Sequence, residues 1–247
     1  MFTKLDVDLE WKENDLVSFL PIILSLCCFV LYWFTAASSH IKNKFYNKYS
    51  FDDAARKHIF FTKYFGFISM GIIPLVICML FLPKSNFSDY GLTFIPETSL
   101  YSLIWTLGLG IVVVPIAFLS AKKEKNLVNY PQIRSKTWTK KTIFITILGW
   151  SLYLFGYELL FRGTLLFPLV DALGVWPAIA VNIGMYSATH IPKGLDETLG
   201  AIPLGLVLCL LTLYSGTIWI AFFVHLFMAI TNCLTAFKYH PDIKYQA

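Results

Sequence analysis

The stretch LVSFLPIILSLCCFVLYWFTAA, residues 16–37, carries no charged side chain. An α-helix needs about 20 predominantly apolar residues to cross the hydrocarbon core of a bilayer. Five further blocks approach or exceed that length: 64–82, 101–121, 142–161, 198–214 and 217–237. A seventh block, 173–189, is slightly short and contains Pro177 and Asn182. Because lipid offers no partners to the N–H and C=O groups of an open strand, these blocks predict membrane-crossing helices.

The composition of the 247-residue chain supports this interpretation. Hydrophobic residues make up 57% of the chain and charged residues only 14%, with a mean hydropathy of +0.63. Soluble domains carry about 25% charged residues, so this chain has too few polar side chains to cover a surface that faces water. We therefore expect an all-α, polytopic membrane helix bundle rather than a soluble domain.

The distribution of charge predicts how the chain lies in a cell membrane. Basic residues concentrate in segments 38–63 and 121–141, whereas segment 83–100 between them holds Lys84 alone against two acidic residues. This is the positive-inside pattern, so both basic segments are expected to be cytoplasmic loops. The N-terminus is acidic, unlike a signal peptide, and is expected outside with the first block retained as a span. Anionic lipid headgroups suffice as partners for the basic loops, and no nucleic acid is expected.

The two halves of the chain differ in the ionisable residues that their apolar blocks contain. Residues 1–141 are interpreted as a scaffold, because their blocks hold essentially no ionisable side chain beyond Lys63 at an edge. Within residues 142–237, four such side chains lie inside the apolar blocks or at their ends: Glu158, Arg162, His190 and His225. Each costs at least about 2.5–3.5 kcal/mol at membrane depth, and such groups usually face the bundle interior or a wet cavity. The second half is therefore expected to carry the functional site.

Glu158 and Arg162 are four residues apart, so they share one face of a helix. One interpretation is an internal ion pair that neutralises two costly charges and fixes the helix to its neighbours. The other is a Glu158 carboxylate that Arg162 orients and that activates a water molecule. Because an arginine beside a carboxylate favours the charged form, the two interpretations conflict in part.

The two histidines, His190 and His225, also admit two interpretations each. Tyr186 and His190 share a helix face before Pro192 ends the helix, and His190 either caps that helix or reaches a cavity. His225 lies among aromatic and aliphatic residues and needs a hydrogen-bond partner from another helix. It is either a packing histidine or a site residue, and Asn232 lies two helical turns further along the same face.

One carboxylate and two imidazoles support several chemistries. A general base can act on water beside two histidines that stabilise an oxyanion. Two histidines and a carboxylate can bind a metal ion, although the chain has no HExxH helix. A chain of Glu and His can relay protons in a transporter. The spacing does not choose among them; no cofactor is expected, and metal dependence stays open.

The second half of the chain resembles the CPBP intramembrane proteases, relatives of the type II CAAX prenyl endopeptidases and of bacteriocin self-immunity proteins. The resemblance covers residues 142–237 and rests on ELLFRG at 158–163, a helix that ends in His190 and a last span that holds His225. The family pattern is two adjacent glutamates followed by arginine, an aromatic residue followed by histidine, and histidine followed by asparagine or aspartate. It implies a bundle of about seven or eight helices with a membrane-embedded, water-accessible site.

This chain departs from the family motifs at two positions. The resemblance assigns catalytic places to Glu158, Arg162, His190 and His225, and puts Tyr186 in the aromatic place. The glutamate that activates water in the family falls on Tyr157, and the asparagine that helps to hold the oxyanion falls on Ala229. An unperturbed tyrosine has a pKa of about 10, so it is no carboxylate base, and alanine donates no hydrogen bond. Tyr157, Tyr186 and Asn232 remain candidates for the cavity or for substrate contact.

Three functions follow as hypotheses. The first is an intramembrane endopeptidase for a membrane-associated protein or peptide, with Glu158 activating water, Arg162 orienting it, and His190 and His225 stabilising the oxyanion. The second is an inactive relative that serves in membrane binding, regulation or immunity, and the third is a small proton-coupled transporter. The first requires Glu158 and His190 to meet, so we expect one helix from 142 to about 171 and a short or re-entrant segment over 173–190.

Overall fold

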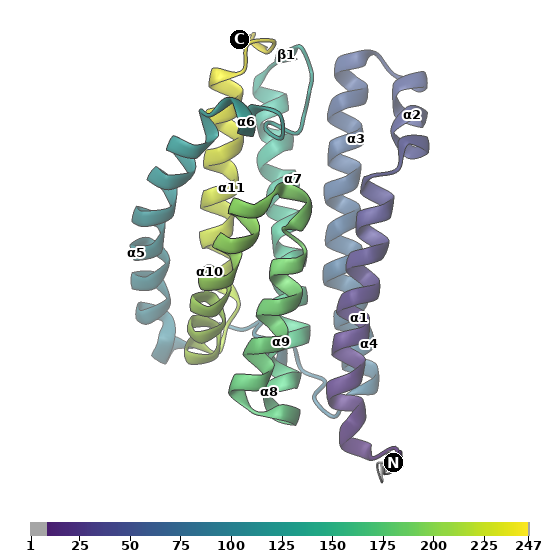
Figure 1. Ribbon diagram of the computed structural model, residues 1–247, viewed down its shortest axis with the longest axis vertical. Helices are drawn as coiled ribbons and strands as arrows, with labels where there is room; N and C mark the ends of the chain where they lie inside the picture. The colour runs from purple at the N-terminus through teal and green to yellow at the C-terminus, as the bar shows by residue number, and fades with distance from the viewer. Residues whose placement is uncertain (1–8, 247) are drawn as a thin grey trace, which may run out of the picture.

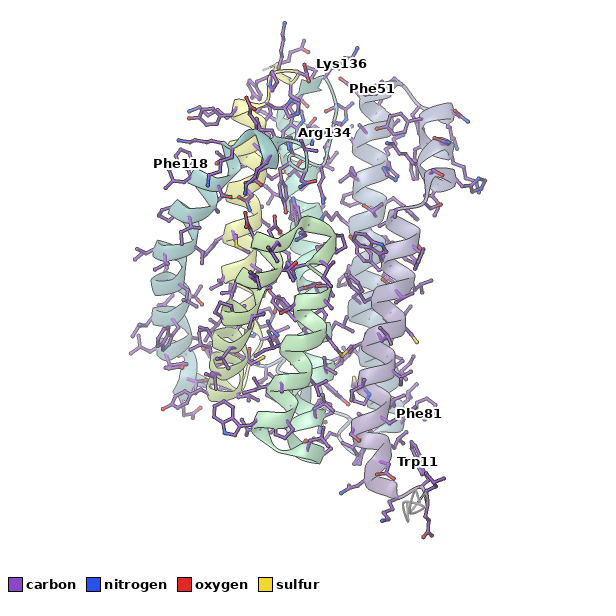
Figure 2. All side chains as sticks on the ribbon, in the orientation of Figure 1. Trp11, Phe51, Phe81, Phe118, Arg134 and Lys136 are labelled. Carbon is purple, nitrogen blue, oxygen red and sulfur yellow. The ribbon has the colours of Figure 1, made fainter. Side chains whose placement is uncertain are left out.

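The computed structural model describes residues 9–246, and nearly all of its regular structure is helical (Figure 1). Within these residues six helices are long and apolar enough to cross a membrane: Asn14–Ala36, Phe51–Phe81, Pro96–Ala121, Lys140–Leu173, Leu195–Ser215 and Trp219–Tyr239. Apolar side chains cover much of the outside of the bundle, and Figure 2 shows Phe118 and Phe81 projecting from it. An all-α polytopic membrane bundle is therefore confirmed.

The N-terminal half begins with α1 (Glu13–Ala36), and its first basic segment is helical rather than a loop, contrary to expectation. It forms α2 (Ser39–Lys48) and α3 (Phe51–Gly66). The Ser38 hydroxyl accepts from the Ile41 N–H and the Ser50 hydroxyl from the Asp53 N–H, which caps each helix. A π-helical stretch, η1 (Phe67–Ile72), carries α3 into α4 (Ile73–Phe81).

The second expectation that fails concerns Lys63. The sequence places it at the edge of a span, but the apolar helix begins twelve residues earlier, at Phe51. Lys63 therefore lies inside this helix, with 3% of its surface exposed.

After α4 the chain passes through a 3-10 turn, η2 (Phe87–Tyr90), into α5 (Pro96–Ala121) and the short α6 (Glu124–Leu127).

A small sheet joins the segment before α7 to the segment after α11. β1 (Thr137–Trp138) pairs in parallel with β2 (Lys244–Tyr245). The Asp52 carboxylate at the start of α3 accepts from the Lys136 and Thr137 N–H groups at 2.7 and 3.2 Å. Both basic segments consequently lie at the end of the bundle that holds β1 and the C-terminus, as α2 and α6 show in Figure 1.

The helix that carries the expected site runs without a break from Lys140 to Leu173. It consists of α7 (Lys140–Glu158), a π-helical stretch η3 (Leu159–Leu166) and α8 (Phe167–Leu173). Gly174, with φ +82°, reverses the chain into α9 (Val175–Ala188), which has only 14 residues and therefore rises about 21 Å. That is too short to cross a bilayer core of about 30 Å. The continuous helix and short return segment agree with the expected arrangement.

The chain turns again through η4 (Ile191–Lys193) into α10 (Leu195–Ser215), and α11 (Trp219–Tyr239) crosses back. The turn between α9 and α10 lies well short of the end that holds β1 (Figure 1). The end of α9 therefore stops at the level of the middle of α7 and α11. This geometry carries His190 to the depth of Glu158.

Two glycines set the distance between the scaffold and the site helix. A Cβ added at Gly156 in α7 would lie 2.8 Å from the Phe67 Cα, and one at Gly71 would lie 2.8 Å from the Gly156 Cα. Contacts this short are not found for real Cβ atoms, so the backbones of η1 and α7 touch only because both residues lack side chains. Gly156 immediately precedes Tyr157 and Glu158, so this crossing fixes where these two residues lie along the axis of the bundle.

The substitution Gly156→Ala should destabilise the protein by about 1–3 kcal/mol, because the added methyl group would force η1 and α7 apart. The measurement is thermal unfolding of the detergent-solubilised protein. Gly108→Ala in α5 is the matched control, since a Cβ there meets nothing within 4 Å. Equal unfolding temperatures for the two variants would contradict the close crossing.

Candidate functional site

Glu158 and Arg162 lie at the junction of α7 and η3, and both side chains are fully buried. The Arg162 Nε is 3.4 Å from the Glu158 Oε2, which makes an ion pair between residues four apart. Neither this oxygen nor the Arg162 Nε and Nη2 has a hydrogen-bond partner among the described residues. The ion pair, one of the two interpretations of this spacing, is present, and both side chains keep hydrogen-bonding atoms without a partner among the described residues.

His225 reaches the same carboxylate from α11. Its Nδ1 contacts the Glu158 Oε1, and because a carboxylate only accepts, the imidazole N–H is the donor. Its Nε2 lies 2.8 Å from the Tyr186 hydroxyl, which comes from α9. His225 thus has the interhelical partners that its position in an apolar helix requires, and it links three helices through one ring.

Arg162 has a second set of partners, which sequence reasoning missed. Its Nη1 donates to the Asn182 Oδ1 and lies 3.6 Å from the Cys209 Sγ, and its guanidinium stacks 4.7 Å from the Tyr186 ring centre. The Asn182 Nδ2 in turn donates to the Phe161 carbonyl at 2.5 Å. Asn182 is fully buried, and the available signal was a strongly polar amide inside a short apolar block.

His190 and Tyr157 lie beside this cluster, Tyr157 buried and His190 partly buried. The His190 Nδ1 donates to the Tyr186 carbonyl at 2.9 Å, and its ring centre is 4.8 Å from that of Tyr186. The Thr189 hydroxyl donates to the same carbonyl, so the Tyr157 hydroxyl, 2.7 Å away, donates to Thr189. The Tyr157 ring centre is 6.5 Å from that of His190 and 6.4 Å from that of His225. The Tyr157 ring therefore lies near both imidazoles.

The remaining two candidates on α11 lie further along the helix. Ala229 is buried in an apolar cluster that includes Trp150 and Leu154 of α7. Asn232 is partly buried, about 10 Å beyond His225 at 1.5 Å per residue, and makes no hydrogen bond to the cluster within residues 9–246. The structure thus brings together Glu158, Arg162, His190, His225, Tyr157 and Tyr186, and leaves Asn232 apart.

The described side chains do not by themselves form a metal site. Within residues 9–246 no group of three or more His, Cys, Asp or Glu side chains is placed to hold a metal ion. His190 is turned to a backbone carbonyl, and Glu158 is shared between an imidazole and a guanidinium.

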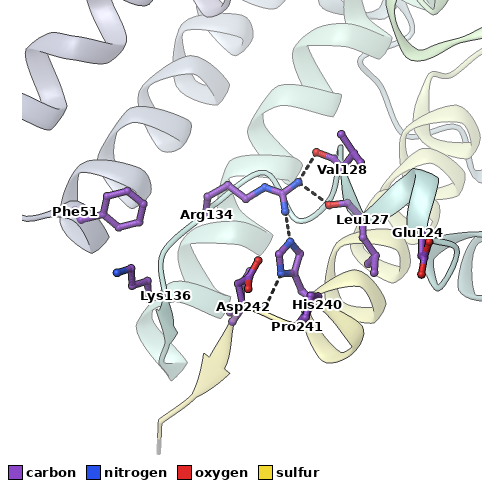
Figure 3. A pocket seen from close by; sticks show the side chains of 10 residues that line it. Phe51, Glu124, Leu127, Val128, Arg134, Lys136, His240, Pro241 and Asp242 are labelled. Atoms are coloured by element: carbon purple, nitrogen blue, oxygen red, sulfur yellow. Dashed lines mark hydrogen bonds between the residues drawn. The ribbon is translucent and has the colours of Figure 1, made fainter.

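A broad cavity of about 620 Å³ lies elsewhere, at the end of the bundle that holds β1 (Figure 3). Arg134 crosses it and donates to the carbonyl oxygens of Leu127 and Val128 and to the His240 Nε2. Burial and the Arg134 charge lower the pKa of His240 below its ordinary value, while Asp242 acts in the opposite sense. These contacts join α6, the segment before β1 and the end of α11.

The fold and the cluster define the class of this protein as a polytopic α-helical membrane protein with a Glu–Arg–His network at membrane depth. Residues 138–231, which contain every member of the network, match the family model described as type II CAAX prenyl endopeptidase Rce1-like. The match covers the segment on whose motifs the resemblance rests, and that resemblance is confirmed. No curated protein and no solved structure matches the chain.

Replacement of Arg162 by methionine should destabilise the protein by about 3–5 kcal/mol, because the buried Glu158 would lose its guanidinium partner. The double substitution Glu158→Gln/Arg162→Met should recover part of that loss. Unfolding in denaturant would measure both. Lys84→Met is the control, since it breaks the exposed Lys84–Asp171 pair and should cost at most about 1 kcal/mol. A similar loss in both single variants would argue against a buried network.

Acidification should weaken the packing around His240. Because the pKa of His240 is lower in the folded than in the unfolded chain, unfolding takes up a proton, and stability falls as the pH drops below about 6.5. His240→Gln should remove this part of the pH dependence. The measurement is the difference in unfolding temperature between pH 7.5 and pH 5.5 for the native chain and the variant. Identical differences would refute the assignment.

Proposed function

We propose that this protein is an Rce1-like membrane protein that binds a membrane-associated peptide or protein segment without hydrolysing it. The supporting observation is the state of Glu158, whose carboxylate is fully buried between His225 and Arg162. A general base must come within hydrogen-bond reach of the water that it activates. In this arrangement the carboxylate is a member of an internal network and has no access to solvent.

Two substitutions relative to the family pattern support the same proposal. Tyr157 occupies the place of the glutamate that activates water, and its hydroxyl is engaged with Thr189. Ala229 occupies the place of an oxyanion donor and lies in an apolar cluster. Loss of one oxyanion donor in an enzyme costs about 10²–10³ in kcat. The class of partner follows from the family description, which names a prenyl endopeptidase.

A second candidate is hydrolysis of a peptide bond with Glu158 as the base. The observation in its favour is the Glu158 Oε2, which has no hydrogen-bond partner among the described residues. If the helices separated slightly, a water molecule could occupy that acceptor position. Tyr186, His225 and Glu158 would then form a continuous hydrogen-bonded chain behind it. Geometry of this kind can tighten when substrate binds.

The two candidates are distinguished with a fluorescent prenylated peptide and the purified full-length protein. The proposal expects the native chain to bind the peptide and not to cleave it, whereas Tyr157→Glu/Ala229→Asn gains cleavage. Cleavage by the native chain that Glu158→Gln abolishes would establish the second candidate instead. Glu97→Gln, which removes an exposed carboxylate at the start of α5, is the control for nonspecific effects. A native chain that neither binds nor cleaves the peptide would refute both.

A further inference from the structure

The cavity at the end of the bundle that holds β1 lies where four membrane-spanning helices begin or end (Figure 3). Phe51 in its lining is the first residue of α3, and His240 directly follows α11. Glu124 lies three residues beyond the end of α5, and Lys136 lies four residues before the start of α7. In a bilayer the headgroup regions add about 5–7 Å on each side of the hydrocarbon core. Since the spans fill that core, the cavity lies at the depth of the lipid headgroups.

The cavity is large enough for a ligand, and part of its lining is apolar. Its volume of about 620 Å³ falls within the range of about 300–1,000 Å³ that is usual for ligand sites. Two apolar side chains of the lining are exposed, Phe51 to 50% and Val128 to 78%. Leu127 and Ile243 add further apolar surface. The cavity therefore suits a ligand that has both an apolar and a charged part.

Two cations in the lining have hydrogen-bond donors left for a ligand. The Arg134 guanidinium donates to two backbone carbonyl oxygens at the end of α6 and to the His240 Nε2, which uses three of its five N–H groups. The Lys136 Nζ lies 5.8 Å from the Phe51 ring centre and, over residues 9–246, forms no ion pair or hydrogen bond. Because its bonds already hold the guanidinium in place, binding of an anion costs little further side-chain entropy.

Two carboxylates, those of Glu124 and Asp242, line the same cavity. Neither carboxylate forms an ion pair within the part of the chain that the structure describes. Figure 3 shows Glu124 on the side of the cavity opposite Lys136, with Asp242 beside the His240 ring. Because burial and the Arg134 charge lower its pKa, His240 is neutral near pH 7. Two cations thus face two carboxylates, and a purely anionic ligand would be repelled by both of the latter.

We propose that this cavity binds the zwitterionic headgroup of phosphatidylethanolamine, with its phosphate at Arg134 and Lys136 and its primary ammonium at Glu124 or Asp242. Phosphate oxygens are strong acceptors for guanidinium and ammonium groups, and a primary ammonium brings three donors to the carboxylates. Choline has no N–H donor and is recognised by cages of several aromatic rings. Among the described residues that line the cavity, only Phe51 carries a phenyl or indole ring. The site does not depend on the proposed peptide binding.

The test uses the full-length protein in nanodiscs of phosphatidylcholine, to which phosphatidylethanolamine or phosphatidylglycerol is added at equal mole fraction. Native mass spectrometry after release into detergent counts the lipids that stay bound. The native chain is compared with Lys136→Met and with the double variant Glu124→Gln/Asp242→Asn. Lys140→Met is the matched control, because it removes an exposed lysine four residues further along the chain that does not line the cavity.

The native chain and Lys140→Met should retain phosphatidylethanolamine in preference to both other lipids. Lys136→Met should bind it about fivefold more weakly, which is the effect of losing one solvent-exposed ion pair of about 1 kcal/mol. The double variant should lose the preference for phosphatidylethanolamine over phosphatidylglycerol, because no carboxylate remains to accept from the ammonium or to repel an anion.

Four outcomes would overturn the proposal. The first is a native chain that retains phosphatidylcholine or phosphatidylglycerol as well as phosphatidylethanolamine. The second is equal binding by Lys136→Met and Lys140→Met, and the third is an unchanged preference in the double variant. The fourth is soluble phosphoethanolamine that raises the unfolding temperature in lipid-free detergent as much as the lipid does, since it would identify a free ligand.

Discussion

Glu158 lies where three helices meet, with its carboxylate between the guanidinium of Arg162 and the imidazole of His225. Through Arg162 it is connected to Asn182, and through His225 to Tyr186, so α7, η3, α9 and α11 share one network. Each of these groups would be costly in hydrocarbon without its neighbours. Removal of any one leaves buried partners unsatisfied, and the relative placement of the helices in the second half therefore depends on this carboxylate.

Backbone geometry makes the network possible. Gly156 and Gly71 let α7 approach the scaffold to backbone contact, which sets the depth of Glu158. Gly174 reverses the chain, and α9 is too short to cross, so its end delivers Tyr186 and His190 to the same depth. A full-length α9 would have carried these residues to the far surface. Because α9 is short, Tyr186 and His190 at its end lie close to Glu158 on the preceding helix.

Two buried cations in this bundle have opposite surroundings. Arg162 is enclosed by a carboxylate, an amide and a thiol, and its charge is balanced within the protein. Lys63 is enclosed by aromatic rings and has no balancing group among residues 9–246. The first arrangement is that of a structural network, in line with the proposed binding role without hydrolysis. The second depends on contacts of the ammonium with the faces of Trp150 and Tyr153.

The sequence by itself determined the all-α membrane bundle, because the length of an apolar block follows directly from bilayer thickness. It also determined the Glu158–Arg162 pair and the Rce1-like motifs, because helical spacing places residues four apart on one face. Only the tertiary structure decided that Arg162 meets Asn182, that Tyr157 lies near both imidazoles and that Lys63 is buried against α7. These contacts join segments 20 to 87 residues apart in the chain, and helical periodicity carries no information about which faces of different helices pack together.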